Sequence, residues 1–253
     1  MELEIFQIDA FTSEVFKGNP ACVVPLVDWL DDKILIKIAK ENNVSETAFL
    51  IKKEKKYFLR WFTPNLEMDL CGHATLATAY FMKHHNDYQG DEILFLTKSG
   101  SIRSKFIKNK IQLHLPLREP IKYKLPNYLA NAINYKPIEV LKSRDIILVF
   151  DKQSKIENIT INRFDFDKLN IDTGGVVFTS RGDNYDFVSR YFTPQSSIFE
   201  DPVTGSSHCS LIPYWSRKLG KKKLKSIQLS ERTGILDCEA YKNHVSISGK
   251  AKT

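Results

Sequence analysis

Long hydrophobic runs are absent from this sequence, and its start lacks a basic leader followed by an apolar stretch. No apolar run approaches the roughly 18 residues that a helix needs to cross a bilayer, and the opening MELEIFQIDAF does not resemble a signal peptide. Only four cysteines occur, and none belongs to a C-x-x-C pair. We therefore expect a reduced, cytoplasmic protein that has no membrane partner.

Low-complexity tracts and nucleic-acid-binding motifs are also lacking, although the net charge is +7. A basic surface attracts phosphate regardless of base sequence. The lysine runs at 52–56 and 221–225, however, lie beside the expected ends of strands or helices. Neither a basic helix nor an alternation of aromatic and basic residues accompanies them. The pattern indicates a solvated surface that favours anionic ligands, and we expect no nucleic-acid partner.

Strand-like and helix-like segments alternate over the 253 residues, a length that suits one large domain or two medium ones. The segment 72–82 is apolar or small on nearly all sides, which predicts a buried helix rather than an amphipathic one. A second helix is expected over 205–219, with a kink at Pro213. The pattern weakens from 121 to 150, and a domain boundary at its start gives halves of 1–120 and 121–253.

An internal repeat relates these two halves. Arg60 opens the run R-W-F-T-P, and Arg190 opens the run R-Y-F-T-P 130 residues later. Each run leads through Glu and Asp to a glycine, Gly72 or Gly205, and the second copy is three residues longer between its Pro and its Gly. Such a repeat indicates duplication. We expect two similar halves that face each other and bring both helix starts to one central cleft.

Both expected helix starts suit the binding of negative charge. A helix N-terminus presents unpaired N–H groups and the positive end of the helix dipole, and glycine lets the backbone approach a ligand closely. Gly72 and Gly205 would then hold a carboxylate, or the charge that develops when a carbon acid loses a proton. The alternative is that Asp69 and Thr204 are only the caps of two buried helices.

Short motifs in order over nearly the whole chain resemble the phenazine-biosynthesis isomerase-like (PhzF-like) family, which shares the diaminopimelate epimerase fold. The matching stretches are F-x-G-N-P-A at 16–21, S-E-T-A-F at 45–49, R-W-F-T-P at 60–64, D-L-C-G-H-A-T at 69–75, F-V-S-R-Y-F-T-P at 187–194, E-D-P-V-T-G-S at 200–206 and V-x-I-S-G-x-A at 245–251. The resemblance implies an α+β fold of two pseudo-symmetric domains, each a rolled, mostly antiparallel sheet around a central helix. It also implies an active site in the cleft between them, a homodimer and no cofactor.

The same resemblance implies the site residues. Its general acid/base carboxylate falls on Glu46, and the other groups are His73 and Asp201 as catalytic residues and Gly72, Gly205, Ser206 and Asn19 as substrate-binding residues. One Glu in a dry cleft can both take up and return a proton. A histidine beside it can relay a proton or hold the substrate carboxylate. Asp201 also suits a plain N-cap, since it lies just ahead of the second helix start.

A metal site is not expected. Cys71 and His73 lie two residues apart at a helix start, and His208 and Cys209 are adjacent on a helix, so the side chains of each pair should diverge. Related epimerases carry matched cysteines at the two helix starts, whereas Thr204 replaces the second one here.

We therefore expect a cofactor-independent isomerase in which Glu46 moves a proton on a small, anionic, carboxylate-bearing metabolite. An amino-acid racemase or epimerase is one alternative, and a binding protein without catalysis is another.

Overall fold

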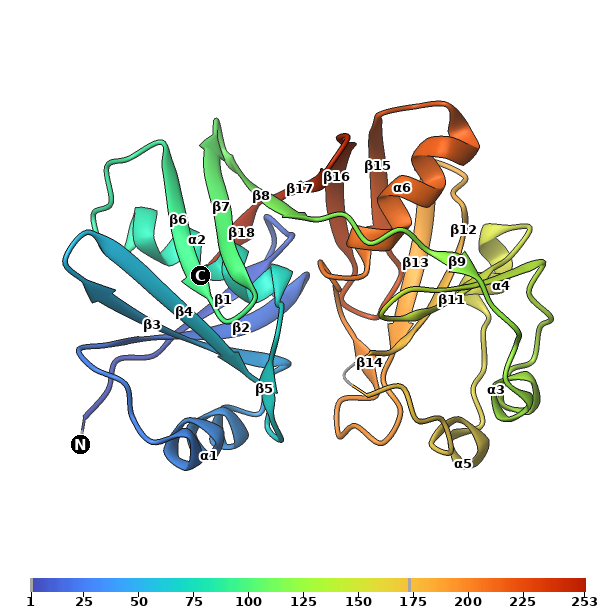
Figure 1. Cartoon of the computed structure of the whole chain (residues 1–253), viewed down its shortest axis with the longest axis horizontal. Coiled ribbons are helices and arrows are strands. Elements are labelled where there is room, and N and C mark those ends of the chain that lie inside the picture. The colour runs from blue at the N-terminus through green and yellow to red at the C-terminus, as the bar shows by residue number, and fades with distance from the viewer. Residues whose placement is uncertain (1, 173) are drawn as a thin grey trace. The chain divides into compact units, whose positions relative to one another are not determined.

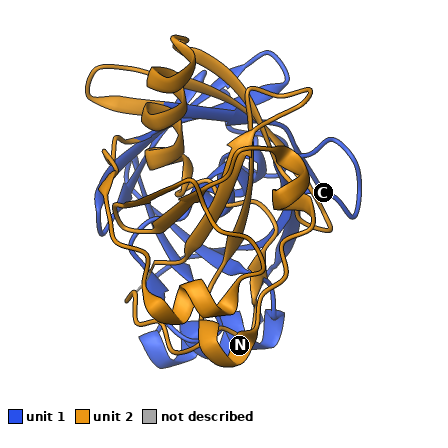
Figure 2. Cartoon of the chain, turned by 90° about the vertical axis from the view of Figure 1, so that its right-hand side faces the viewer, with its two compact units in different colours: residues 1–115, 246–253 blue, residues 116–245 orange. Residues whose placement is uncertain are grey.

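Two compact units make up the computed structural model, which describes residues 2–172 and 174–253 (Figure 1). One unit contains the residues up to 115 together with 246–253, and the other contains 116–245 (Figure 2). The division expected at 120/121, with the whole tail in the second half, differs from this at both points. The tail returns to the first unit because its last strand, β18 (Ala251–Lys252), pairs antiparallel with β1 (Phe6–Ala10).

The first unit is a mixed, mostly antiparallel sheet with two helices. Its other elements are β2 (Asn19–Leu26), α1 (Asp32–Asn42), β3 (Glu46–Lys53), β4 (Lys56–Phe62), β5 (Glu67–Met68), α2 (Gly72–His84), β6 (Glu92–Thr97), β7 (Gly100–Ile107) and β8 (Lys110–Pro116).

The helix α2 is the central helix of this unit. Ten of its 13 residues are buried, and it packs against β1, β2, β3 and β18. The predicted all-round apolar helix is thereby confirmed. The helix α1 instead buries one face, on which Leu35 and Ala39 meet Phe49 and Phe62. Among the described residues, no helix combines the length and the apolar character that crossing a bilayer requires.

The second unit has the same kind of sheet. Its elements are β9 (Ile121–Lys122), α3 (Asn127–Ala132), β10 (Glu139–Lys142), β11 (Ile146–Val149), α4 (Gln153–Glu157), α5 (Arg163–Phe166), β12 (Val176–Arg181), β13 (Phe187–Phe192), β14 (Glu200–Asp201), α6 (His208–Leu219), β15 (Lys223–Gln228) and β16 (Gly234–Ala240). The strand β17 (His244–Gly249) then leads the chain back into the first unit.

Strand pairing follows the same scheme in both units. In the first, β3 pairs parallel with β2 and antiparallel with β4, which in turn pairs antiparallel with β5 and parallel with β6. In the second, β12 and β13 repeat this scheme with β11, β14 and β15. A largely buried helix follows the short strand in each, α2 after β5 and α6 after β14. The duplication predicted from the repeat is confirmed.

The repeated run has a structural role in both units. Arg60 donates two hydrogen bonds to Glu67, at 2.8 and 3.0 Å, and Arg190 donates two to Glu200, at 2.7 and 2.8 Å. Each guanidinium also lies over the phenylalanine two residues further along, about 5.0 and 4.9 Å from the ring centre. These contacts hold β5 against β4 and β14 against β13. The three extra residues of the second copy lie in the loop between β13 and β14.

The start of α6 corrects the expectation that a helix begins at Gly205. The residues 205–207 form a turn closed by bonds three residues apart, from the N–H of His208 to the carbonyl of Gly205 and from the N–H of Cys209 to the carbonyl of Ser206, both 3.2 Å. The regular helix therefore begins only at His208.

The expected kink at Pro213 does not interrupt this helix, which continues to Leu219. A proline lacks the N–H that would bond four residues back. The carbonyl of Cys209, which loses that partner, accepts the backbone N–H of Arg118 at 3.0 Å. The connection between β8 and β9 thus supplies the missing hydrogen bond.

Candidate acid/base site

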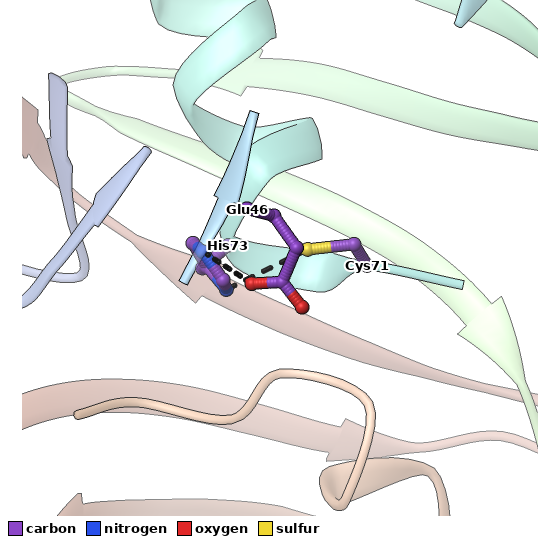
Figure 3. A group of neighbouring side chains, drawn as sticks. All are labelled: Glu46, Cys71 and His73. Carbon is purple, nitrogen blue, oxygen red and sulfur yellow. Dashed lines mark hydrogen bonds and ion pairs between the residues drawn. The ribbon is translucent and has the colours of Figure 1, made fainter. Parts of the chain in front are cut away.

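Three of the predicted site residues meet in the first unit at one edge of its sheet. Asn19 is the first residue of β2, and Glu46 is the first residue of β3. The two strands run parallel, so both begin at the same edge. His73 is the second residue of α2, which starts beside them, and Cys71 precedes that helix (Figure 3).

His73 contacts a different group through each ring nitrogen. Its Nε2 lies 3.2 Å from Oε2 of Glu46. Its Nδ1 lies 3.2 Å from Nδ2 of Asn19 and 3.6 Å from Sγ of Cys71. Asn19 is fully buried and the His73 side chain is 3% exposed, whereas the Glu46 side chain retains 13% exposure. The carboxylate is therefore the member of the group that is most open to a small molecule.

The amide of Asn19 determines which nitrogen of His73 carries the hydrogen. An amide NH₂ group can only donate, so Nδ1 accepts in this contact. The single hydrogen of the neutral imidazole then lies on Nε2, the nitrogen that is close to Glu46. A separation of 3.2 Å between Nε2 and Oε2 is within the reach of direct proton transfer.

Gly18 directs Asn19 into this contact. Its φ of +70° is in the left-handed region, and a Cβ there would lie 2.2 Å from the carbonyl oxygen of Ala10 and 2.7 Å from the side chain of Thr12. Only glycine fits such a turn. The glycine of the G-N-P motif is therefore required by the backbone path that leads into β2.

The residues predicted in the second unit lie together at the turn between β14 and α6. The carboxylate of Asp201 accepts the hydroxyl hydrogen of Thr204, so it caps this turn. Ser206 is 7% exposed, and its Oγ accepts a hydrogen bond from Arg144 at 2.8 Å. Gly205 opens the same turn. That these residues share one site with Glu46 stays a prediction.

The equivalent strand registers show which residues correspond between the units. Thr47 pairs with Phe62 in the first unit and Val176 with Phe192 in the second, so the residue before Thr47, Glu46, corresponds to Gly175.

No carboxylate fits at Gly175, because even a Cβ would lie 2.5 Å from the Tyr191 ring. Around the helix-start glycines, Cys71 corresponds to Thr204 and His73 to Ser206. Of the two copies as described, only the first carries the Glu–His pair.

Glu46, Cys71 and His73 also offer metal-ligand atoms that lie within 4.8 Å of one another. The expectation that Cys71 and His73 diverge is wrong, because the extended backbone of Cys71 (φ −132°, ψ 112°) turns its Sγ toward the ring. The thiol nevertheless approaches Nδ1 while the carboxylate approaches Nε2. A single ion bound through one ring nitrogen would therefore require the group to rearrange, and the geometry favours proton transfer.

The other pair considered for metal binding, His208 and Cys209, lies at the start of α6. His208 bonds to the carbonyl of Thr204 at 2.9 Å and to Oγ of Ser226 at 3.1 Å. Burial raises the pKa of the Cys209 thiol to about 12, which disfavours the thiolate that a metal would need.

Sequence reasoning missed Arg144 and Asp145, which are packed close to Ser206. Both lie in the turn between β10 and β11, and the side chain of Asp145 is 2% exposed. The available signal was an Arg-Asp pair placed directly before the fully apolar run 146–150. Charges at the mouth of a buried strand need partners.

The sequence is similar to known proteins over nearly its whole length. The model of a family described as phenazine biosynthesis-like protein matches residues 8–253. An uncharacterized isomerase of Pseudomonas aeruginosa is 44% identical over 99% of this chain and 96% of its own length.

Solved structures show the same likeness. A crystal structure of a phenazine biosynthesis protein of the PhzF family from Enterococcus faecalis is 40% identical, with a TM-score of 0.93 over 100% of this chain and 96% of that one. A predicted epimerase of Pseudomonas aeruginosa, 18% identical with a TM-score of 0.75 over 99% of this chain and 96% of that one, shares the fold.

Proposed function

We propose a proton-transfer function for this chain, which belongs to the phenazine biosynthesis-like protein family. At the level of the family it is an isomerase, as relatives of 40–44% identity are named. We propose more specifically that it moves a proton on a small carboxylate-bearing metabolite without a cofactor. The observation that carries this proposal is the 3.2 Å contact between Glu46 and His73, with the ring held from its other side by Asn19.

In this mechanism Glu46 removes a proton from a carbon that is activated by conjugation or by a neighbouring carbonyl. The electron pair of the broken C–H bond moves into the adjoining π system, and Glu46 then returns the proton to another carbon of the same molecule. The Nε2–H of His73 stabilises the carboxylate of Glu46 before the proton is taken up and again after it is returned. One carboxyl group thereby serves as base first and as acid second.

The start of α2 can stabilise the negative charge that develops on the substrate. No acidic residue lies in the first turn of α2. A helix start of this kind is suited to an anion, because its N–H groups and its dipole both favour negative charge. We propose that the turn at Gly205 and Ser206 in the second unit binds the same substrate, with Asp201 beside it.

The correspondence between the units supports one base rather than two. A racemase that works with two bases needs an acid and a base on opposite faces of the α-carbon. In the second unit, the positions equivalent to Glu46 and Cys71 hold Gly175 and Thr204. Neither side chain is an acid or base near neutral pH, so an isomerase with one shuttling carboxylate is the better candidate.

The deciding experiment incubates the purified protein in D₂O with a panel of small carboxylic acids and follows them by NMR. Deuterium uptake with a shifted double bond or hydrogen supports the isomerase. Uptake with loss of chirality identifies a racemase, and binding without uptake identifies a binding protein. We also propose a homodimer, which light scattering in solution tests.

A further inference from the structure

Arg144 and Asp145 form a buried charged pair that the proposed proton transfer does not use. Arg144 donates from Nε to Oδ1 of Asp145 at 3.2 Å and from Nη2 to Oδ2 at 3.4 Å. Asp145 also accepts the backbone N–H of Gly175 at 3.1 Å and the hydroxyl of Tyr191 at 3.0 Å. A buried carboxylate needs several donors of this kind. The bonds hold the guanidinium in one orientation.

Two glycines allow this packing. A Cβ at Gly174 would lie 2.6 Å from the carbonyl oxygen of Arg144, and a Cβ at Gly175 would lie 2.5 Å from the ring of Tyr191. The chain at 174–175 therefore lies directly against the turn that carries the charged pair. Three segments of the second unit thus pack together around Arg144 and Asp145.

The oriented guanidinium also reaches Ser206, the residue after Gly205. Its Nη2 donates to Oγ of Ser206 at 2.8 Å. A guanidinium has no acceptor, so the serine oxygen must be the acceptor in this bond. The hydroxyl hydrogen of Ser206 is consequently turned away from Arg144 and can be donated to another group.

In the first unit a comparable contact is made to His73, the residue that corresponds to Ser206. Asn19, where the chain enters β2, contacts His73, the residue after Gly72. Arg144, where the chain enters β11, contacts Ser206. Since β2 and β11 occupy the same place in the two pairing schemes, the segment that leads into this strand contacts the residue after the helix-start glycine in both units.

We propose that Arg144 is a positioning residue that aims the hydroxyl of Ser206 at the carboxylate of the substrate. This inference rests on the proposed function, because it takes Ser206 as a substrate-binding residue. Asp145 neutralises the charge of Arg144, so Arg144 contributes an oriented N–H donor rather than net charge. Its loss should weaken substrate binding and leave the proton-transfer step at Glu46 largely intact.

The test uses the acid that wild-type protein exchanges fastest in D₂O and compares KM and kcat among variants. The double variant Arg144→Gln/Asp145→Asn removes both charges together, which avoids leaving Asp145 buried without a counter-ion. It should raise KM about tenfold, the worth of one hydrogen bond to a charged group, with kcat changed less than about threefold. Ser206→Ala should do the same, and adding it to the double variant should produce no further rise. Arg144→Lys should recover part of the loss.

A matched control removes another ion pair of the second unit, Lys221–Asp186, whose Nζ and Oδ1 are 2.6 Å apart. Lys221→Gln/Asp186→Asn should leave KM unchanged, and thermal unfolding of every variant separates loss of fold from loss of binding. Two results would overturn the inference while the proposed function stands. One is a rise in KM that multiplies when the Ser206 change is added to the Arg144 double variant, and the other is a KM that does not change. Wild-type protein that neither binds nor exchanges any acid of the panel would overturn both.

Discussion

Replacing Glu46 with glutamine separates the proposed chemistry from the fold. The substitution keeps the shape of the side chain and removes only the group that titrates. The side chain keeps 13% exposure and its Oε2 lies 3.2 Å from Nε2 of His73, so weakening this contact should cost the folded state about one hydrogen bond, roughly 1 kcal/mol. General acid/base groups contribute about 10²–10⁴-fold to a rate. This corresponds to about 3–5 kcal/mol in the barrier.

The assay is deuterium exchange into the substrate, followed by NMR, alongside chemical denaturation of the same preparations. We expect Glu46→Gln to lose at least about 100-fold in turnover. Its unfolding free energy should fall only by roughly 1 kcal/mol. Ligand binding should be largely retained. A variant that loses rate and stability in proportion would indicate a damaged fold.

Two cysteine variants serve as controls for the role of Glu46. Cys71→Ser should retain most activity, because Sγ contacts Nδ1 of His73 at 3.6 Å, whereas the carboxylate of Glu46 lies at Nε2. Cys209→Ala should act only through packing, since this thiol is fully buried inside α6. If Cys71→Ser is inactive and Glu46→Gln is active, the proposed isomerase is wrong and a thiol-based epimerase replaces it.

Two further predictions concern the second unit. Gly175→Ala should lower the unfolding free energy by about 1–3 kcal/mol, as overpacking does, because its Cβ would lie 2.5 Å from the Tyr191 ring; an unchanged melting temperature would contradict this. His208 should make stability fall as the pH drops from about 6.5 to about 4. Burial lowers its pKa in the folded protein from 6.5 to about 4, so the unfolded chain binds the proton first in this window. The loss should reach about 3 kcal/mol, and denaturation at pH 7.5 and pH 4.5 should show a smaller pH dependence for His208→Gln.

Sequence patterns predicted the regular parts of the fold and missed the short parts for a physical reason. The strands β6, β7 and β8 alternate buried and more exposed residues, which is the pattern by which a strand is recognised from sequence. The strand β11 is buried at all four positions and pairs parallel with β12, so it shows no alternation. The helices α3, α4 and α5 have four to six residues, too few to display a helical period.

The candidate site likewise contains residues that local sequence patterns predict and residues that they do not. Glu46, His73 and Asn19 were predicted because they belong to short motifs that match a family. Arg144 and Asp145 belong to no such motif, and their importance arises from contacts with Tyr191 and Ser206, 46 and 62 residues further along the chain. Contacts at this separation depend on the folded arrangement of β11, β13 and the 205–207 turn, which local patterns do not specify.

Duplication gave both units the same backbone and left them with different chemistry at equivalent places. The start of β3 holds the carboxylate of Glu46 beside a histidine, whereas the start of β12 follows Gly175, where no side chain fits. The space at that glycine is filled by the ring of Tyr191, whose hydroxyl bonds to Asp145 and thereby supports Arg144. Restoring a carboxylate at Gly175 would displace this ring and the donor to Asp145. The second copy therefore cannot supply a carboxylate at the position equivalent to Glu46 without losing its own buried network, which is why we infer chemistry with a single shuttling carboxylate.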